Sequence, residues 1–221
     1  MFEDRKINKI VKLPYGLRDI FPSESEERNN IKKVISDEFE KWGYGEVKTP
    51  VIEYTKNISI GVGKDWKDKL INFFDIDGSL VSLRSDMTIP IARLTGMRIK
   101  KEQLPVRFCY FADSFRQSDI QKGIRRVCNQ AGLEFIGSSN SVMSDTEILI
   151  ILINILNSIN LQGYRIGLGH IEFIDGLCDW LKCDLKEREY VRKVIAARNF
   201  VELENFLYKK SKSKTNIFMS L

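Results

Sequence analysis

Residues 115–137 read FRQSDIQKGIRRVCNQAGLEFIG, and this stretch decides the fold. Two segments that can extend as strands enclose a basic segment with a glycine, so the pattern predicts a strand, a loop and a second strand. Side chains of a strand alternate between its two faces with a period of two. One face of the second strand therefore carries Cys128, Gln130, Gly132 and Glu134.

The strand that precedes the loop has one small face and one apolar face. Ala112, Ser114 and Arg116 share the first, and Cys109, Phe111 and Phe115 share the second. Small residues surrounded by an arginine, an amide and a carboxylate suit a small polar ligand with both charges, such as an amino acid. Gly132 is expected to leave space between Gln130 and Glu134. The alternative is that these two residues lie on the solvated face of an antiparallel sheet.

This block resembles the second signature motif of class II aminoacyl-tRNA synthetases, in its histidyl branch. The matching positions are Phe115-Arg116, Gln121-Lys122-Gly123, Gln130 and Glu134. Two positions depart from that branch: Ser118 stands where it has a nucleotide-binding glutamate, and Cys128 stands where it has the aromatic that stacks on adenine. The residues that would contact the amino acid are kept, and those that would contact adenine are lost. This combination resembles the synthetase-like regulatory subunits of ATP phosphoribosyltransferase.

Three earlier segments are similar to the same family. Residues 13–22 resemble the start of its domain. Residues 24–42 form a charged amphipathic stretch with helical spacing that Gly43 ends, and residues 46–54 resemble the first class II motif, which usually builds the dimer interface. Pro50 in that motif cannot donate to a β-ladder and indicates an edge or a bulge. Plain core packing explains the apolar residues of this segment equally well.

A further segment, residues 83–93, carries Asp86 and Thr88. Histidyl-tRNA synthetases have a carboxylate here that faces the amino group of histidine, and the resemblance gives that role to Asp86. Both residue types also accept hydrogen bonds at a helix start, and Pro90 is a residue of first helical turns. Either residue could cap the helix, and capping and ligand binding can coexist in Asp86 and Thr88 only if different oxygens serve the two roles.

Composition narrows the function classes. The chain has 221 residues and a formal net charge of +5, from 35 basic and 30 acidic residues. The dense basic run at 209–214 is typical of a frayed, solvated tail, so nucleic-acid binding is not expected. The apolar residues 148–156, after Ser144-Asp145, predict a capped, buried helix and not a membrane span. The amino terminus shows no secretory signal.

The inventory of reactive side chains is short. The four cysteines (109, 128, 178 and 183) have no CxxC spacing, which indicates reduced thiols in the cytoplasm. His170 is the only histidine, so no histidine metal cluster and no histidine-based catalysis are expected. We expect His170 to be a structural, half-buried residue of an apolar strand at 164–171. No P-loop, dinucleotide fingerprint or catalytic triad is present.

These observations predict an α+β domain of the class II synthetase type, with a mainly antiparallel sheet flanked by helices. We expect an incomplete core at residues 1–174 and a helical insertion with a basic tail at residues 175–221, truncated relative to the family. The resemblance implies a noncatalytic cytoplasmic regulatory subunit of ATP phosphoribosyltransferase that senses histidine. It binds no cofactor or metal, forms a homodimer and associates with the catalytic subunit. The alternative is a divergent or truncated histidyl-tRNA synthetase. The resemblance gives the histidine-binding residues as Asp86, Thr88, Arg116, Gln130 and Glu134.

Overall fold

The computed structural model describes residues 12–61, 69–117 and 125–210. The chain divides into two compact units, Met1–Gln162 and Gly163–Leu221. The sequence analysis expected the core to extend to residue 174 and predicted an apolar strand at 164–171. Residues 164–170 form no strand, and His170 lies at the start of a helix with its side chain 71% exposed, so the predicted strand and the predicted half-buried histidine were both wrong.

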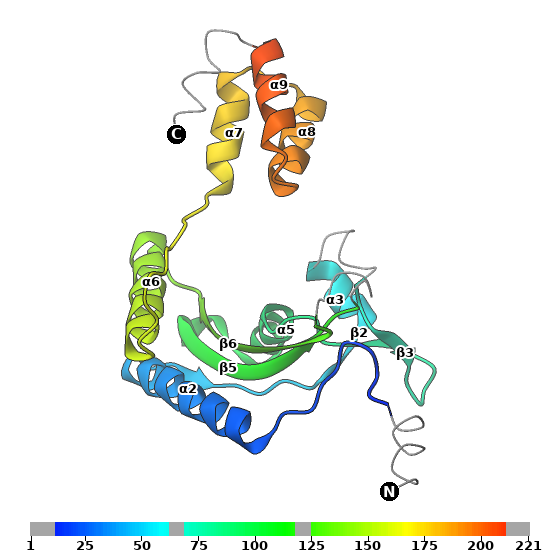
Figure 1. Ribbon diagram of the computed structural model, residues 1–221, viewed down its shortest axis with the longest axis vertical. Helices are drawn as coiled ribbons and strands as arrows, with labels where there is room; N and C mark the ends of the chain where they lie inside the picture. The colour runs from blue at the N-terminus through cyan, green and yellow to red at the C-terminus, as the bar shows by residue number, and fades with distance from the viewer. Residues whose placement is uncertain (1–11, 62–68, 118–124, 211–221) are drawn as a thin grey trace, which may run out of the picture. The chain divides into compact units, whose positions relative to one another are not determined.

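The first unit contains two three-stranded sheets and their helices (Figure 1). One sheet has the order β1-β5-β6, in which β5 and β6 are antiparallel over ten residue pairs and β1 is parallel to β5. The other is antiparallel, with the order β2-β4-β3. The strands are β1 (Gly45–Glu46), β2 (Ile52–Tyr54), β3 (Asn72–Phe74), β4 (Leu80–Leu83), β5 (Val106–Phe115) and β6 (Val127–Ile136).

Helices lie on both faces of the β5-β6 pair, with α2 on one side and α5 on the other (Figure 1). The predicted amphipathic helix is α2, which has a proline in its first turn and ends before Gly43, a glycine with φ of +76°. The helical elements of this unit are α2 (Pro22–Lys41), α3 (Thr55–Gly61), α5 (Thr88–Arg98), the 3₁₀ turn η1 (Lys101–Gln103) and α6 (Ser141–Ser158).

The core of the first unit fills the space between α2, α6 and one face of β5-β6. Phe39 of α2, Cys109 of β5 and Ile151 of α6 are buried there, as the apolar face of β5 predicted. Polar contacts join the same elements: the buried Glu38 accepts from Trp42 at 3.1 Å and from Asn154 of α6 at 2.7 Å.

The helix α6 differs from its prediction. It begins at Ser141, and its cap is Asn140, whose side chain accepts from the Met143 amide. Among the described helices, α6 is the one that is long and apolar enough to cross a membrane. It packs against α2 and has only three buried residues, so the expectation of a buried helix was wrong. Its exposed apolar side chains are Val142, Met143, Ile150, Leu152 and Ile153.

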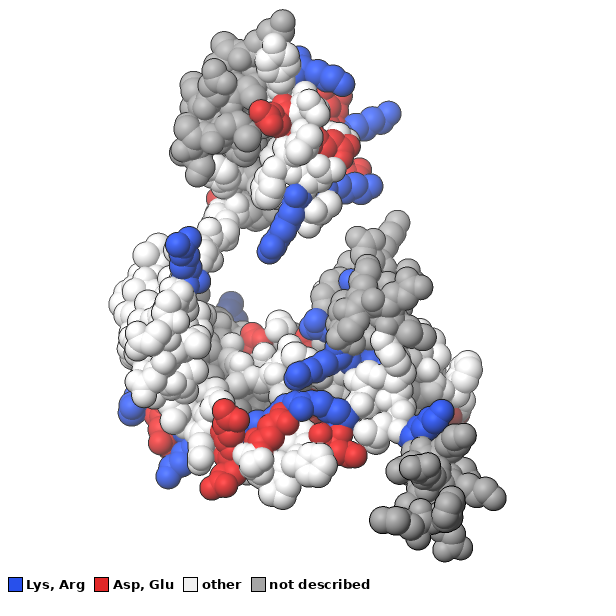
Figure 2. Space-filling model, viewed as in Figure 1, with Lys and Arg blue, Asp and Glu red and all other residues white. Residues whose placement is uncertain are grey.

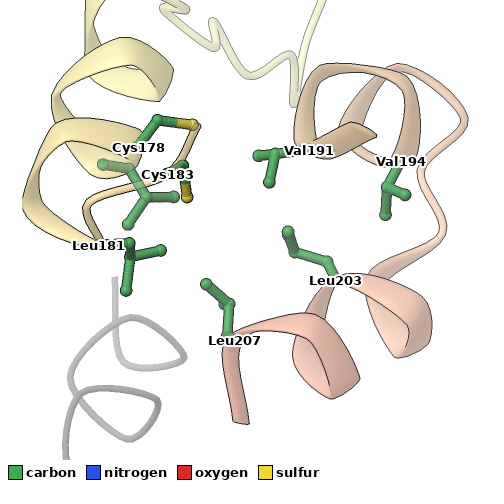
Figure 3. Packing of buried hydrophobic residues seen from close by; sticks show 8 residues of the cluster. Cys178, Leu181, Cys183, Val191, Val194, Leu203 and Leu207 are labelled. Atoms are coloured by element: carbon green, nitrogen blue, oxygen red, sulfur yellow. The ribbon is translucent and has the colours of Figure 1, made fainter. Parts of the chain in front are cut away.

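The second unit is a group of three helices with its own core: α7 (Ile171–Trp180), α8 (Leu185–Ala196) and α9 (Phe200–Lys210). The sequence predicted helices in all three places. Asp184 and Glu187 form a reciprocal capping box at the start of α8. Lys210, assigned to a frayed tail, instead belongs to α9 and pairs with Glu187 at 2.5 Å. Figure 3 shows the core, formed by Leu177, Cys178, Leu181, Cys183, Val191, Val194, Leu203 and Leu207.

An ion pair fastens α6 to β5. Arg107 donates from Nε and Nη2 to the two oxygens of Glu147, each at 2.8 Å, and the Tyr44 hydroxyl donates to Glu147 at 2.8 Å. The Arg107 guanidinium also lies 4.1 Å from the centre of the Phe135 ring. These bonds to Arg107 and Tyr44 hold the pKa of Glu147 below its ordinary value despite its burial.

We predict that Glu147→Gln destabilises the first unit by about 1.5–3 kcal/mol at pH 7, the range for hydrogen bonds to a charged group. Because the folded-state pKa is lowered, the contribution is fully present above the ordinary glutamate pKa of about 4.3 and is lost as the pH falls through the folded value. Urea unfolding of both proteins between pH 3 and pH 7 measures this. The control is Asp145→Asn, an exposed carboxylate of the same helix. A difference between wild type and Glu147→Gln that persists unchanged at pH 3 contradicts the charge as its source.

Candidate functional site

The β5-β6 pair presents a second face, opposite the core, that we call the site face. The antiparallel register pairs Tyr110 with Gly132, Ala112 with Gln130 and Ser114 with Cys128, so these residues share it. Phe108 opposite Glu134 extends the same face. The sequence predicted this arrangement, and the ten-pair register confirms it. The site face consists of Phe108, Tyr110, Ala112, Ser114, Cys128, Gln130, Gly132 and Glu134.

The start of α5 is bonded to the site face. The Thr88 hydroxyl donates to Glu134 Oε1 at 2.7 Å. Asp86 divides its two oxygens, because Oδ1 accepts from the Ile89 amide at 3.1 Å and Oδ2 accepts from the Ser85 hydroxyl at 3.2 Å. Capping therefore falls to Asp86, and Thr88 bonds to β6 instead. One oxygen of Asp86 is taken up by the helix amide, and the other makes only a longer side-chain contact.

Arg116 lies at the same end of the site. Its Nε donates to the main-chain oxygen of Ser85 at 3.2 Å, next to Asp86 in the chain. Its amide donates to the Arg126 carbonyl at 2.9 Å, which extends the β5-β6 ladder beyond Phe115. The structure thus places a guanidinium and two carboxylates, those of Asp86 and Glu134, around one sheet face. Such a set can hold a ligand that carries both an ammonium and a carboxylate.

Gln130 contributes an acceptor without a donor. Its Oε1 is buried and has no hydrogen-bond partner among the described residues. A buried carbonyl oxygen left unpaired costs about 1–3 kcal/mol, so native proteins normally satisfy it. Gln130 lies two residues from Gly132 and four from Glu134 on the site face. A ligand N–H group bound there would provide the missing hydrogen bond.

Tyr110 is a site residue that the sequence analysis missed. A Cβ atom on Gly132 would lie 2.4 Å from its hydroxyl oxygen and 2.5 Å from Cζ, so its ring fills the space that was expected to be open. Burial raises the pKa of Tyr110, and the charges of Glu134 and Asp86 raise it further. The period of two that placed Ala112 and Ser114 on this face also places residue 110 there.

Other sequence-based expectations lie outside this group. Ser118 and Gln121-Lys122-Gly123 lie outside the described residues. Cys128 is exposed on the site face and presents no aromatic ring. His170 belongs to the second unit. Among the described residues, no group of three or more His, Cys, Asp or Glu side chains could hold a metal ion.

We predict that Gly132→Ala displaces the Tyr110 ring and destabilises the first unit by about 1–3 kcal/mol, the cost typical of overpacking. Chemical unfolding measures the loss. Truncating the ring in a Gly132→Ala/Tyr110→Leu double variant relieves the overlap, so the added alanine costs much less there. Gly96→Ala is the matched control: nothing lies within 4 Å of its Cβ position in α5, so it stabilises slightly. If Gly132→Ala lowers the free energy of unfolding equally in the wild-type and Tyr110→Leu backgrounds, the contact between Gly132 and the Tyr110 ring is contradicted.

Curated relatives match most of the chain. An ATP phosphoribosyltransferase regulatory subunit of Symbiobacterium thermophilum is 36% identical over 194 residues, which cover 87% of this chain and 48% of that protein. A protein of the same name from Ruminiclostridium cellulolyticum is 32% identical over 194 residues, covering 88% and 46%. The chain thus spans about half the length of these relatives.

Solved structures show the same fold. A Bacillus halodurans protein described as an ATP phosphoribosyltransferase regulatory subunit/histidyl-tRNA synthetase matches with a TM-score of 0.80 and 26% identity, over 90% of this chain and 51% of its own. The apo histidyl-tRNA synthetase of S. aureus matches with a TM-score of 0.58 and 25% identity, over 69% and 40%. These similarities confirm the class II synthetase-like α+β fold.

The matched family model covers nearly the whole chain. It is described as histidyl-tRNA synthetase and matches residues 16–221. The match includes α5, β5 and β6, which build the site face, and also the helices of the second unit. With this coverage, the chain belongs to the histidyl-tRNA synthetase family.

Proposed function

We propose that this protein is a noncatalytic regulatory subunit of ATP phosphoribosyltransferase, acts in histidine biosynthesis in the cytoplasm and senses histidine. The curated relatives carry the name of that subunit. The charges of the site indicate the class of ligand, because two carboxylates and a guanidinium complement the ammonium and carboxylate groups of a free amino acid.

The observation that carries the proposal is the unpaired Oε1 of Gln130 on the same face as Glu134. Histidine offers N–H donors on its imidazole and its ammonium group, so it can satisfy this oxygen. We assign Asp86 and Glu134 to the ligand's ammonium, Thr88 and Gln130 to further polar contacts, and Arg116 to its carboxylate or to a phosphate. The bond between Thr88 and Glu134 orients the Glu134 carboxylate toward the site.

The noncatalytic part of the proposal rests on the nucleotide side of the site. A synthetase must hold ATP, and aromatic stacking is a usual way to hold an adenine ring. Cys128 is exposed on β6 with a thiol in place of such a ring. The second candidate is a histidyl-tRNA synthetase activity, which the family match and the fold of the S. aureus enzyme favour.

We further propose that the chain forms a homodimer through the segment from Trp42 to Tyr54. The strand β2 ends the sheet order β2-β4-β3, and apolar side chains before and along it are solvent-exposed. Val51 is 43% exposed, Ile52 47% and Tyr54 52%. An edge strand with exposed apolar side chains is suited to association with another chain. The position of Pro50 just before this edge strand agrees with its inability to donate to a ladder.

We predict that L-histidine binds and that Glu134→Ala raises its dissociation constant at least about thirtyfold. Removing one partner of a bound charge commonly costs about 2–5 kcal/mol, which corresponds to such a change. Isothermal titration calorimetry measures both constants. Glu102→Ala, which removes an exposed carboxylate of η1, is the control and leaves binding unchanged. Equal affinity in the Glu134→Ala variant means that Glu134 is a solvated residue of the sheet and nothing more.

The assembly prediction concerns regulation. Co-expressed with the catalytic ATP phosphoribosyltransferase subunit of its own organism, the chain copurifies with it, and histidine inhibits the complex more strongly than the isolated catalytic subunit. Coupling free energies of about 1–3 kcal/mol give a change of at least severalfold in the inhibition constant. Activity assays with and without the chain measure this, and Glu134→Ala blunts the difference.

Two results would refute the regulatory role. One is a catalytic subunit that is equally active and equally sensitive to histidine without this chain. The other is histidine-dependent pyrophosphate exchange by the chain alone, abolished by Arg116→Ala, which would establish the synthetase instead.

A further inference from the structure

A cavity lies on the opposite face of the β5-β6 pair from the site face. Its volume is about 600 Å³, within the usual range for small-molecule sites. Three apolar side chains form much of its wall, namely Ile31 and Ile35 of α2 and Phe111 of β5. Asp113 and Asn129, which are paired across the strands, border it on the sheet side. We call it the α2 cavity.

Arg84 brings a charge without a counter-ion to the α2 cavity. The residue is 8% exposed, and its Nε and Nη1 donate to the main-chain oxygens of Asp113 at 2.8 Å and Thr49 at 2.9 Å. Its Nη2 has no partner among the described residues, and no carboxylate there pairs with it, although Arg84 lines the cavity. A buried cation that is bonded only to neutral carbonyls favours an anion beside it.

Lys32 adds a second positive charge at the cavity. Its Nζ lies 4.9 Å from the centre of the Phe111 ring and forms no ion pair with any carboxylate that the structure describes. The one described carboxylate that lines the cavity is Asp113, and it already accepts from Asn129 Nδ2. Arg28, also in the lining, is occupied by Glu24 at 2.8 Å and by Asn129 Oδ1. With Arg28 paired to Glu24, the cations of Arg84 and Lys32 face the single carboxylate of Asp113, so the cavity lining keeps one net positive charge.

We propose that the α2 cavity binds a small organic anion. Its carboxylate or phosphate is held by Arg84 Nη2 and Lys32, and its flat or aliphatic body lies against Ile31, Ile35 and Phe111. Carboxylates and phosphates are the groups that a guanidinium recognises best, and apolar walls with few polar groups are typical of small-molecule sites. The side chains of Phe111, Asp113, Asn129 and Ala131, which line the α2 cavity, belong to the face opposite the proposed histidine site. Ala112 and Gln130 also line the cavity, although their side chains belong to the site face, so the two sites adjoin through these two positions of the sheet.

The test titrates the ¹⁵N-labelled protein with phenyl phosphate and with benzoate, followed by NMR. One aromatic body then carries each of the two anionic groups, and their relative affinities distinguish phosphate from carboxylate. We expect chemical-shift changes at residues 28–35 of α2 and at the 111–113 and 129–131 segments of β5 and β6. Benzamide, which has the same ring without the charge, binds at least about tenfold more weakly, the effect expected from one lost charge-assisted contact.

Variants of the cavity wall locate the binding. Lys32→Ala weakens phenyl phosphate binding about tenfold, and Ala131→Leu, which narrows the cavity from the sheet side, weakens it further. Lys33→Ala removes a neighbouring exposed lysine of α2 that does not line the cavity, so it leaves binding unchanged. Unchanged cross-peak dispersion shows that each variant is folded.

Three outcomes overturn the proposal. The first is that neither anion shifts these resonances at about 10 mM, a concentration at which even millimolar dissociation constants give near-saturation. The second is that benzamide binds as well as benzoate. The third is that Lys32→Ala and Lys33→Ala have equal effects, which would mean general attraction of anions to the helix.

Discussion

The first unit depends on the buried guanidinium of Arg84. Its side chain bonds to the carbonyls of Thr49 and Asp113, while its own amide donates to Val51 and its carbonyl accepts from the Phe115 amide. One residue thus connects the two sheets, from the segment before β2 to the far end of β5. The planar guanidinium can reach two main-chain oxygens at fixed angles, which the single ammonium of a lysine cannot do. These bonds fix where Ser85, Asp86 and the start of α5 lie.

The hydrogen bonds of Arg84 set the geometry on both faces of the β5-β6 pair. On one face, the fixed start of α5 brings Thr88 to Glu134 and lets Arg116 reach the Ser85 carbonyl. On the other, Arg84 lines the cavity beside α2. Charged side chains of both signs lie close together over the surface of this unit that Figure 2 shows. On the face in this view, the charges of the described residues therefore form local groups of both signs and not a broad field of one sign.

The sequence predicted well what depends on periodicity and short-range signals. The alternation in residues 127–136 gave the faces of β6, and the spacing of Ile35, Phe39 and Trp42 gave α2. It predicted poorly what depends on distant partners. Nothing in residues 164–171 shows that this apolar segment lacks a strand to pair with, and the position of Tyr110 over Gly132 follows only from the register. The pairing of Lys210 with Glu187 is also set by how α8 and α9 pack.

The strict alternation along β6 also limits how this protein can change during evolution. Substitution can alter one face at a time, because each side chain points to a single face. An insertion or deletion of one residue inside the strand would switch every later side chain to the other face. The Glu134 side chain would then point toward the apolar core beside Ile151, and the Leu133 side chain would point away from it. Such a change would bury an unpaired carboxylate and remove a core residue at once. Changes in chain length are therefore expected in the connections between strands, and the length of β6 itself is expected to stay fixed.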